Sequence, residues 1–197
     1  MKKLLLIGIT IVFTISCNNK QQPDNKENKD FDYTTSFEKS NGFETATYDE
    51  VIDYYTNLAA SYPTVKIDTI GATDAGKPLH VVWFNKNESF TKNAETISLL
   101  INNGIHPGES DGIDATMMLY RDLAQHKINI NPNIIIATIP IYNVGGSLNR
   151  NTGTRANQNG PKSYGFRGNA RNFDLNRDFI KSDTKNAKTF AQIYHMI

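Results

Sequence analysis

Short apolar runs alternate with longer polar or mixed segments along the chain, and this pattern predicts an α/β protein. Four runs rich in β-branched residues predict strands buried on both faces, at residues 65–70, 79–84, 97–102 and 134–141. Glycines and a proline between the first two runs predict a hairpin-like connection. A helix-length segment separates the last two runs, which favours a parallel crossover.

Three further segments show helical periodicity. Residues 48–61 predict a helix whose start carries the capping-box pair Thr47 and Glu50, and Pro63 ends it. Residues 110–125 present one apolar face that we expect to pack on the sheet, formed by Ile113, Met117, Tyr120 and Ala124. Residues 184–197 predict a last helix with a stripe of Ala187, Phe190, Ala191, Tyr194 and Ile197. That helix has no capping residue at its end, so we expect the domain to continue beyond residue 197.

The N-terminal residues carry an export signal. A basic start and an apolar run at residues 4–15 precede Cys17, and the run is shorter than the roughly 20 residues that a membrane-spanning helix needs. The segment resembles a bacterial lipoprotein signal, which implies that Cys17 is lipidated and anchors the protein to a membrane. Thr14 stands where that signal usually has leucine, which leaves ordinary cleavage or an uncleaved anchor open.

This pattern divides the chain into three parts. We expect a lipoprotein-type signal peptide at residues 1–17, a polar flexible tether at 18–43 and a folded domain at 44–197. The implied location is the cell envelope of a bacterium, in the periplasm or on the outer surface. With one cysteine, no intrachain disulfide can form. A formal charge of +1 among 197 residues gives no field that would attract nucleic acid.

A pair of metal-ligand types follows the third predicted strand. In NNGIHPGES, His106 and Glu109 stand three residues apart at the junction of strand, loop and helix. A histidine nitrogen and a carboxylate oxygen at this spacing can converge on one Zn²⁺. The same pair at a helix start can also be a capping arrangement, so the pattern alone leaves both interpretations open.

Several ordered motifs resemble the zinc carboxypeptidase family. They are IGATDAGKPL at residues 70–79, HPGE at 106–109, IPIYNVGG at 139–146 and FDLNRDF at 173–179, so the resemblance runs from about residue 47 to the end of the chain. It implies a mixed, mostly parallel sheet flanked by helices and one zinc ion. It also implies hydrolysis of the C-terminal peptide bond of peptides or proteins, whose C-termini would be the partners.

The resemblance also assigns site residues. It implies that His106 and Glu109 are zinc ligands and that Asp174 accepts a hydrogen bond from the ligand histidine. It further implies that Asn176 and Arg177 hold the free carboxylate of the substrate, a role that suits a guanidinium. Two plainer interpretations stay open: Arg177 could form an ion pair with Asp178 or Asp183, and Asp174 could cap a loop.

Residues 143–172 form a long stretch rich in Asn, Gly and Arg that predicts a functional loop. We expect one of its arginines to face the scissile carbonyl oxygen, where negative charge develops. The candidates are Arg150, Arg155, Arg167 and Arg171, of which Arg155 in TRANQN is preferred by its position. Gly108 departs from the family, since many relatives have arginine just before the glutamate ligand.

The motifs found do not complete a catalytic site. The resemblance places a third zinc ligand, a histidine, and a general-base glutamate beyond residue 197, so we expect the 197-residue chain to be inactive by itself. Two alternatives to a metallocarboxypeptidase remain: a zinc amidase or deacylase that acts on cell-wall peptides or small acyl amides, and a non-catalytic envelope lipoprotein that binds peptides.

Overall fold

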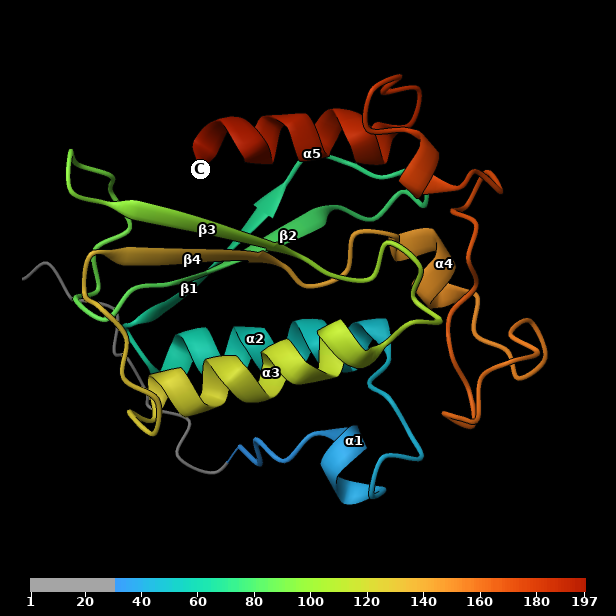
Figure 1. Ribbon diagram of the computed structural model, residues 1–197, viewed down its shortest axis with the longest axis horizontal. Coiled ribbons are helices and arrows are strands. Elements are labelled where there is room, and N and C mark those ends of the chain that lie inside the picture. The colour runs from blue at the N-terminus through green and yellow to red at the C-terminus, as the bar shows by residue number, and fades with distance from the viewer. Residues whose placement is uncertain (1–30) are drawn as a thin grey trace, which may run out of the picture.

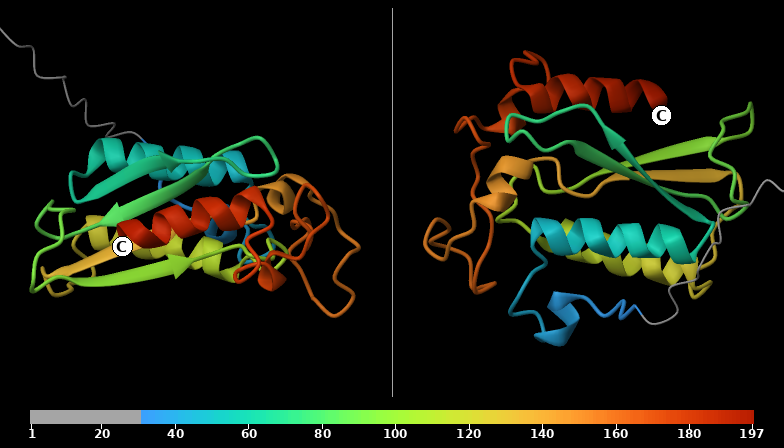
Figure 2. Two further views of the ribbon diagram at one scale, coloured as in Figure 1. Left: turned by 90° about the horizontal axis from the view of Figure 1, so that it is seen from above. Right: turned by 180° about the vertical axis from the view of Figure 1, so that it is seen from behind.

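One four-stranded mixed sheet forms the centre of the molecule, with helices on both of its faces (Figure 1). The structure is a computed structural model that describes residues 31–197. Helices α2 (Tyr48–Ser61) and α3 (Asp111–Ala124) lie side by side on one face, and α5 (Lys185–Met196) lies on the other (Figures 1 and 2). This arrangement confirms the predicted fold class of a mixed sheet flanked by helices. Among the described strands one of the three pairings is parallel, so this part of the sheet is not mostly parallel as expected.

The strand order is β1-β2-β4-β3. Strands β1 (Val65–Ile70) and β2 (Leu79–Phe84) form the predicted hairpin, and β2 also pairs antiparallel with β4 (Ile134–Ile139). Strand β3 (Ile97–Asn102) pairs parallel with β4, in register from Ile97 opposite Ile134 to Asn102 opposite Ile139. The predicted parallel crossover through α3 is therefore confirmed, while β4 ends two residues before the expected position.

The core lies between the sheet and the pair α2–α3. All four residues of the predicted α3 face are buried, and the hydroxyl of Tyr120 at its centre donates to Val82 O at 2.8 Å and lies 2.9 Å from the Thr138 hydroxyl. Thr47 and Glu50 form the predicted capping box at the start of α2. Tyr55 packs edge-on against Tyr120, which joins the two helices in one aromatic cluster.

The prediction that every strand is buried on both faces is correct for the central strands and wrong for the edges. In β2 and β4 all but one residue each are buried, whereas Ile97 and Leu99 of β3 are 59% and 48% exposed. β3 has a hydrogen-bonded neighbour on one side only, and it lies at the margin of the sheet (Figure 2). The apolar composition of β3 therefore led to a wrong prediction that this strand is buried on both faces.

Helix α5 is rotated relative to the predicted stripe. Ala187 is buried and Phe190 and Ile197 are partly buried as expected, but Ala191 and Tyr194 are exposed. The buried face instead includes the polar residues Asn186 and Thr189 together with Ile193. Both polar side chains bond to backbone groups of neighbouring segments, which makes their burial favourable.

The segment assigned to the end of the tether packs on the domain. Helix α1 (Ser36–Lys39) has its own capping box, formed by Thr35 and Glu38. Tyr33 packs edge-on against Tyr54, and Arg121 of α3 donates to both carboxylate oxygens of Glu38. Residues 31–43 thus contact the folded part, which begins before the expected boundary at 44.

The expected signal peptide, including Cys17, lies outside the described residues. Across residues 31–197, none of the helices has the length and apolar character needed to cross a membrane.

Candidate active site

The candidate site begins where β3 and β4 end, because parallel strands bring their carboxyl ends to the same edge of the sheet. Gly104 turns the chain after β3 with φ of 63°, and a side chain there would meet Ile113 at 3.1 Å. Backbone bonds still join the two segments beyond the strands, from Asn143 N to Gly104 O at 3.0 Å. The loop that carries His106 is therefore fixed to the end of β4.

Asn143 ties three segments of the site together. This fully buried side chain accepts from Gly146 N at the start of the short helix α4 (Val144–Leu148). Its amide nitrogen donates to Ile105 O at 3.3 Å and to Arg167 O at 2.9 Å. The Asn143 side chain therefore holds both Ile105, which precedes His106, and the long loop at Arg167.

His106 is buried and its two ring nitrogens have different partners. Nε2 lies 2.9 Å from Asp174 Oδ1, and Nδ1 lies 3.5 Å from Glu109 Oε1. Arg167 Nη1 lies 3.3 Å from Nδ1. Because a guanidinium can only donate, this contact places the lone pair on Nδ1 and the proton on Nε2, facing Asp174.

Asp174 stands at the start of the 3₁₀ helix η1 (Leu175–Arg177) and collects several donors. Its Oδ2 accepts from Arg167 Nε at 3.2 Å and Nη2 at 2.9 Å, and its Oδ1 also accepts from Asn176 N at 3.0 Å. Burial raises the pKa of Asp174, but the hydrogen bonds from His106, Arg167 and the backbone lower it to about 2. The carboxylate is thus ionised and can hold the His106 ring. Asp174 also caps the start of η1 through Asn176 N. It therefore plays both of the roles that the sequence suggested, as the acceptor for His106 and as a loop cap.

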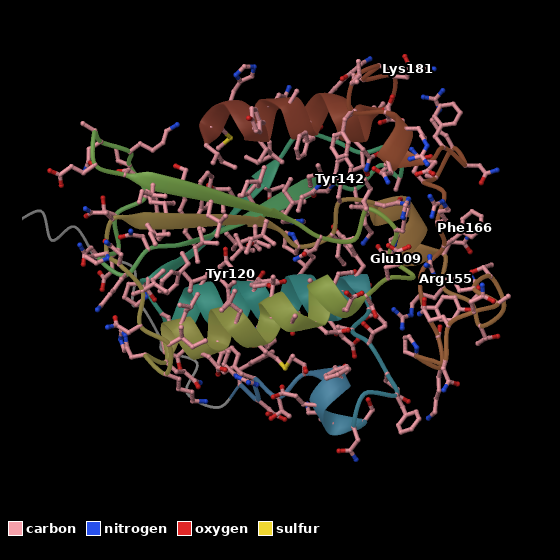
Figure 3. All side chains as sticks on the ribbon, in the orientation of Figure 1. Glu109, Tyr120, Tyr142, Arg155, Phe166 and Lys181 are labelled. Atoms are coloured by element: carbon pink, nitrogen blue, oxygen red, sulfur yellow. The ribbon has the colours of Figure 1, made fainter. Side chains whose placement is uncertain are left out.

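Glu109 lies across from His106 and is bound by a loop arginine. Arg155 Nη2 donates to Glu109 Oε1 at 2.7 Å, and these two side chains meet at the loop side of the molecule in Figure 3. Desolvation raises the pKa of Glu109, and Arg155 and His106 together lower it below its ordinary value. An ionised carboxylate and the Nδ1 lone pair, which Arg167 Nη1 faces at 3.3 Å, therefore converge on one point.

Asn176 and Arg177 are exposed beside this group. The Arg177 guanidinium forms no ion pair with Asp178 or Asp183, which excludes the plainer interpretation from the sequence; it donates to Asn176 O at 3.1 Å. Asp178 instead binds the start of α5 through Thr184. Arg177 and Asp174 both line a surface cavity of about 280 Å³ that also includes Phe173 and Lys181.

The sequence matches the zinc carboxypeptidase family model over residues 51–195. The chain belongs to this family. Among curated proteins no match to the sequence was found.

Solved carboxypeptidases share the fold. A metallo-carboxypeptidase from Burkholderia cenocepacia is similar with a TM-score of 0.60 and 18% identity, over 79% of this chain and 39% of that one. A Pseudomonas aeruginosa metallo-carboxypeptidase, solved with (2-guanidinoethylmercapto)succinic acid, gives a TM-score of 0.55 and 15% identity over 77% and 37% of the two chains. The chain thus spans about two fifths of the length of these carboxypeptidases.

The donors found here suit the zinc ion that the family name implies. Histidine nitrogen and carboxylate oxygen bind zinc at about 2.0–2.2 Å, so two such donors around a tetrahedral ion lie roughly 3.4 Å apart. The separation of His106 Nδ1 and Glu109 Oε1 is 3.5 Å. A carboxylate on the other ring nitrogen is the usual support of a metal-bound histidine. Within residues 31–197, no set of three or more His, Cys, Asp or Glu side chains is arranged to hold a metal.

The four candidate loop arginines separate into two pairs. Arg155 and Arg167 reach the carboxypeptidase-like site, through Glu109 and His106 respectively, and both line an open groove of about 550 Å³. Arg150 donates to three backbone carbonyl groups, those of Thr45, Ala46 and Ser163, and Arg171 lies over the ring of Phe173. That Arg155 faces the scissile carbonyl group stays a prediction. Arg167 lines the same groove and is equally placed for this role.

Gly108 is explained by the path of Arg155. A side chain at residue 108 would meet Arg155 Cδ at 2.6 Å and Gly165 O at 2.9 Å. Gln158 Nε2 also donates to Gly108 O at 2.8 Å, so the loop lies directly on this peptide. The position that carries arginine in many relatives is therefore closed to a side chain here, and a loop arginine occupies the space.

Sequence reasoning missed the polar residues that hold the loops. Asn143 and Asn169 are buried and bond to backbone groups of the site, yet each stands in a stretch rich in asparagine. The one available signal for Asn143 was its place directly after a predicted strand, in IPIYNVGG.

Proposed function

We propose that this chain supplies the metal-binding part of a zinc-dependent carboxypeptidase that removes the C-terminal residue of peptides or proteins. The observation that carries the proposal is the state of His106, whose Nε2 is held by Asp174 while Nδ1 points at Glu109. This arrangement leaves a neutral imidazole nitrogen and an ionised carboxylate directed at one position, which is what a zinc site requires.

Asn176 and Arg177 are the proposed contacts for the substrate carboxylate. Arg177 is exposed at a cavity that Asp174, Asp178 and Asp183 also line, but its guanidinium forms no ion pair with Asp178 or Asp183, so its remaining donors are available to an anion. A guanidinium can grip a carboxylate through two parallel hydrogen bonds, and an amide beside it adds orientation. The pair would select a chain end over the middle of a chain.

The chemistry is divided between the chain and a bound metal ion. If bound at His106 and Glu109, a zinc ion would supply an acidified water and polarise the scissile carbonyl group. Asp174 keeps the His106 tautomer, and Arg155 or Arg167 offers a cation to the oxygen that becomes negative when water adds to the carbonyl carbon. We place the third ligand and the general base outside these 197 residues; that base takes the proton from water and passes it to the leaving amine as the C–N bond breaks.

The test compares two peptides that differ only at the chain end. The gene is first read beyond the codon for Ile197, and the protein it encodes is incubated with a peptide that has a free C-terminal carboxylate and with the same peptide as its C-terminal amide. We expect chelator-sensitive release of one amino acid from the free acid alone, lost in Glu109→Gln. Arg177→Gln should raise KM for the free acid by about tenfold or more, as expected for a lost charged hydrogen bond.

Other outcomes identify the alternatives. Equal hydrolysis of acid and amide, or cleavage of small acyl amides only, would favour an amidase or deacylase and refute the carboxypeptidase. Binding of the free acid without turnover or zinc stoichiometry would favour a peptide-binding lipoprotein. A stop codon directly after Ile197 would also refute catalysis by this protein, because the expected third ligand would not exist.

We further propose that the protein is exported and held at a membrane by a lipid on Cys17. The proposal is supported by the basic and apolar residues before this cysteine. Cells expressing the protein are labelled with radioactive palmitate. Label that follows the wild-type protein to the membrane fraction and is lost in Cys17→Ser supports the anchor; a wild-type protein without label refutes it.

A further inference from the structure

The turn between β1 and β2 lies against the site, although its motif IGATDAGKPL has no role in the proposed chemistry. We propose that Asp74 in this turn is a positioning residue for the candidate metal site: through Asn169 it fixes the loop that presents Asp174 to His106. This inference rests on the proposed zinc site for its importance to function. The hydrogen-bond coupling itself involves only residues of this chain.

The Asp74 carboxylate is enclosed and has a specific partner. Its side chain is 4% exposed although it belongs to a turn, and Oδ2 accepts from Asn169 Nδ2 at 3.0 Å. The nearest cation is Arg171 Nη1, 3.8 Å from Oδ1, on a side chain that is 51% exposed. A buried carboxylate needs hydrogen-bond donors, and Asn169 supplies the short contact.

Asn169 uses its other amide atom to shape the loop. Its Oδ1 accepts from Arg171 N and from Phe173 N, both at 2.9 Å. Its backbone closes the same loop, because Asn169 N donates to Phe173 O at 2.9 Å and its carbonyl accepts from Asn172 N at 2.8 Å. Rotation of the Asn169 amide would break both side-chain bonds, so Asp74 determines which way the amide faces.

The loop ends at the residue that holds His106. Asp174 follows Phe173 directly, and its Oδ1 receives both His106 Nε2 and Asn176 N. Three hydrogen-bonded steps therefore lead from the turn to the imidazole: Asp74 to Asn169, Asn169 to Phe173 N, and Asp174 to His106. A supporting carboxylate of this kind typically changes metal affinity by about 10- to 100-fold when it is disturbed.

The turn that carries Asp74 is itself anchored on α5. Asp74 N donates to Asn186 Oδ1 at 3.2 Å, and Asn186 Nδ2 donates to Tyr142 O at 2.8 Å, next to Asn143. Gly71 has φ of 48° and a side chain there would meet Thr189 at 2.6 Å, so the turn sits directly on the helix. Figure 2 shows this turn beside the first residues of α5 in both views. The contacts with α5 thus hold the backbone of the turn, and Asp74 with it, in place.

The experiment exchanges the two members of the pair. Asn169→Asp sets two carboxylates against each other, whereas the double variant Asp74→Asn/Asn169→Asp restores one donor and one acceptor with the roles reversed. Asp74→Asn alone keeps an acceptor oxygen and serves as the mild change should Asn169→Asp fail to fold, which circular dichroism reports. Asn85→Asp is the matched control, because Asn85 is also buried and donates to two carbonyl groups at the opposite end of the sheet.

Two properties are measured on each variant, the first on the 197-residue chain and the second on the protein that the gene encodes beyond Ile197. Long-range ¹H–¹⁵N NMR reports the His106 tautomer without metal, and competition with a chromogenic chelator reports zinc affinity. We expect Asn169→Asp to mix the tautomers and weaken zinc binding at least about tenfold, and the exchanged pair to recover to within about threefold of wild type. Asp74→Asn should lie between them, and Asn85→Asp should lower stability without changing the His106 signals.

The outcomes separate the two proposals. If Asn169→Asp lowers stability as Asn85→Asp does and leaves the His106 tautomer unchanged, the pair is merely structural and the inference is overturned. Failure of the exchanged pair to restore the wild-type tautomer also overturns it. If the wild-type protein read beyond Ile197 binds no zinc but the tautomer responds as expected, the zinc site is wrong and the positioning role of Asp74 stands.

Discussion

The contact between Glu38 and Arg121 should hold the N-terminal segment on the domain. Arg121 Nη1 donates to Oε1 and Oε2 of Glu38 at 2.9 and 2.8 Å, and also to Tyr33 O at 3.1 Å. The two side chains are 15% and 28% exposed. We would make Glu38→Gln, Arg121→Met and the double variant, so that a thermodynamic cycle isolates the pair from its other contacts.

The expected coupling is about 1–2 kcal/mol. Exposed ion pairs contribute roughly 0–1 kcal/mol, and a pair that is mostly buried and charge-assisted contributes more. Arg121→Met alone should cost more than Glu38→Gln, because it also leaves Tyr33 O without this donor. The loss should appear first as local opening of residues 31–43, since this segment packs on the core through partly buried residues such as Tyr33 and contributes none of its strands.

The coupling should depend on pH with a definite sign. The hydrogen bond from Arg121 lowers the pKa of Glu38, an effect opposed by burial and aided by Thr35. A carboxyl with a lowered pKa in the folded state contributes stability above its unfolded pKa of about 4.3, and this contribution is lost as the pH falls through the folded value. The coupling should therefore decrease between about pH 6 and pH 3.

Hydrogen exchange of amides in residues 34–41 measures the opening free energy at each pH, and urea unfolding measures the global stability. The surface pair Glu44–Lys162, with side chains 52% and 73% exposed, is the control and should show no coupling. A Glu38–Arg121 coupling below about 0.3 kcal/mol, or one that is constant with pH, would refute the reasoning.

Three further changes test the core, the loop and the site. Tyr120→Phe should lower the free energy of unfolding, measured with urea, by about 1–3 kcal/mol, because the buried acceptors of the Tyr120 hydroxyl lose their donor. The control Tyr194→Phe, at an exposed position, should have no effect. Equal losses of stability in the two variants would contradict this role of the Tyr120 hydroxyl. Gly108→Ala should destabilise the loop by about 1–3 kcal/mol, because the new methyl group would clash with Arg155. The control Gly153→Ala should be neutral, because the space around residue 153 is open. An unchanged melting temperature of Gly108→Ala would show that the loop moves aside at no cost. Asp174→Asn should weaken zinc binding about 10- to 100-fold in the chelator competition without unfolding the protein, and an unchanged affinity would remove its supporting role.

Local signals predicted the parts of the fold that local energies decide. The capping box of Thr47 and Glu50 and the apolar face around Tyr120 involve residues within one or two helical turns. The pair Thr35 and Glu38 has the same capping signature but was assigned to the tether. It lacks an apolar stripe, and its docking depends on Arg121, which lies 83 residues away in the sequence.

Long-range partners explain the remaining errors. Helix α5 turns Thr189 inward because Ala72, 117 residues earlier, offers its backbone, so an apolar pattern alone pointed to the wrong face. In the site, the spacing of His106 and Glu109 is local and could be found from the motif. The choice among loop arginines depends on how residues 150–167 cross the site, and spacing alone does not determine that path.

The anchoring of the site by Asn143 has a consequence for the order of folding. In the folded structure, the pairing of β3 with β4 and the hydrogen bonds of Asn143 hold His106, Arg167 and Asp174 together, so we expect these residues to meet after the strands have paired. In a small zinc domain with close ligands, the metal can organise the unfolded chain. Here the metal would find its donors only after the slow, long-range pairing of the sheet is complete. Zinc added during refolding should therefore leave the folding rate unchanged and slow only the unfolding.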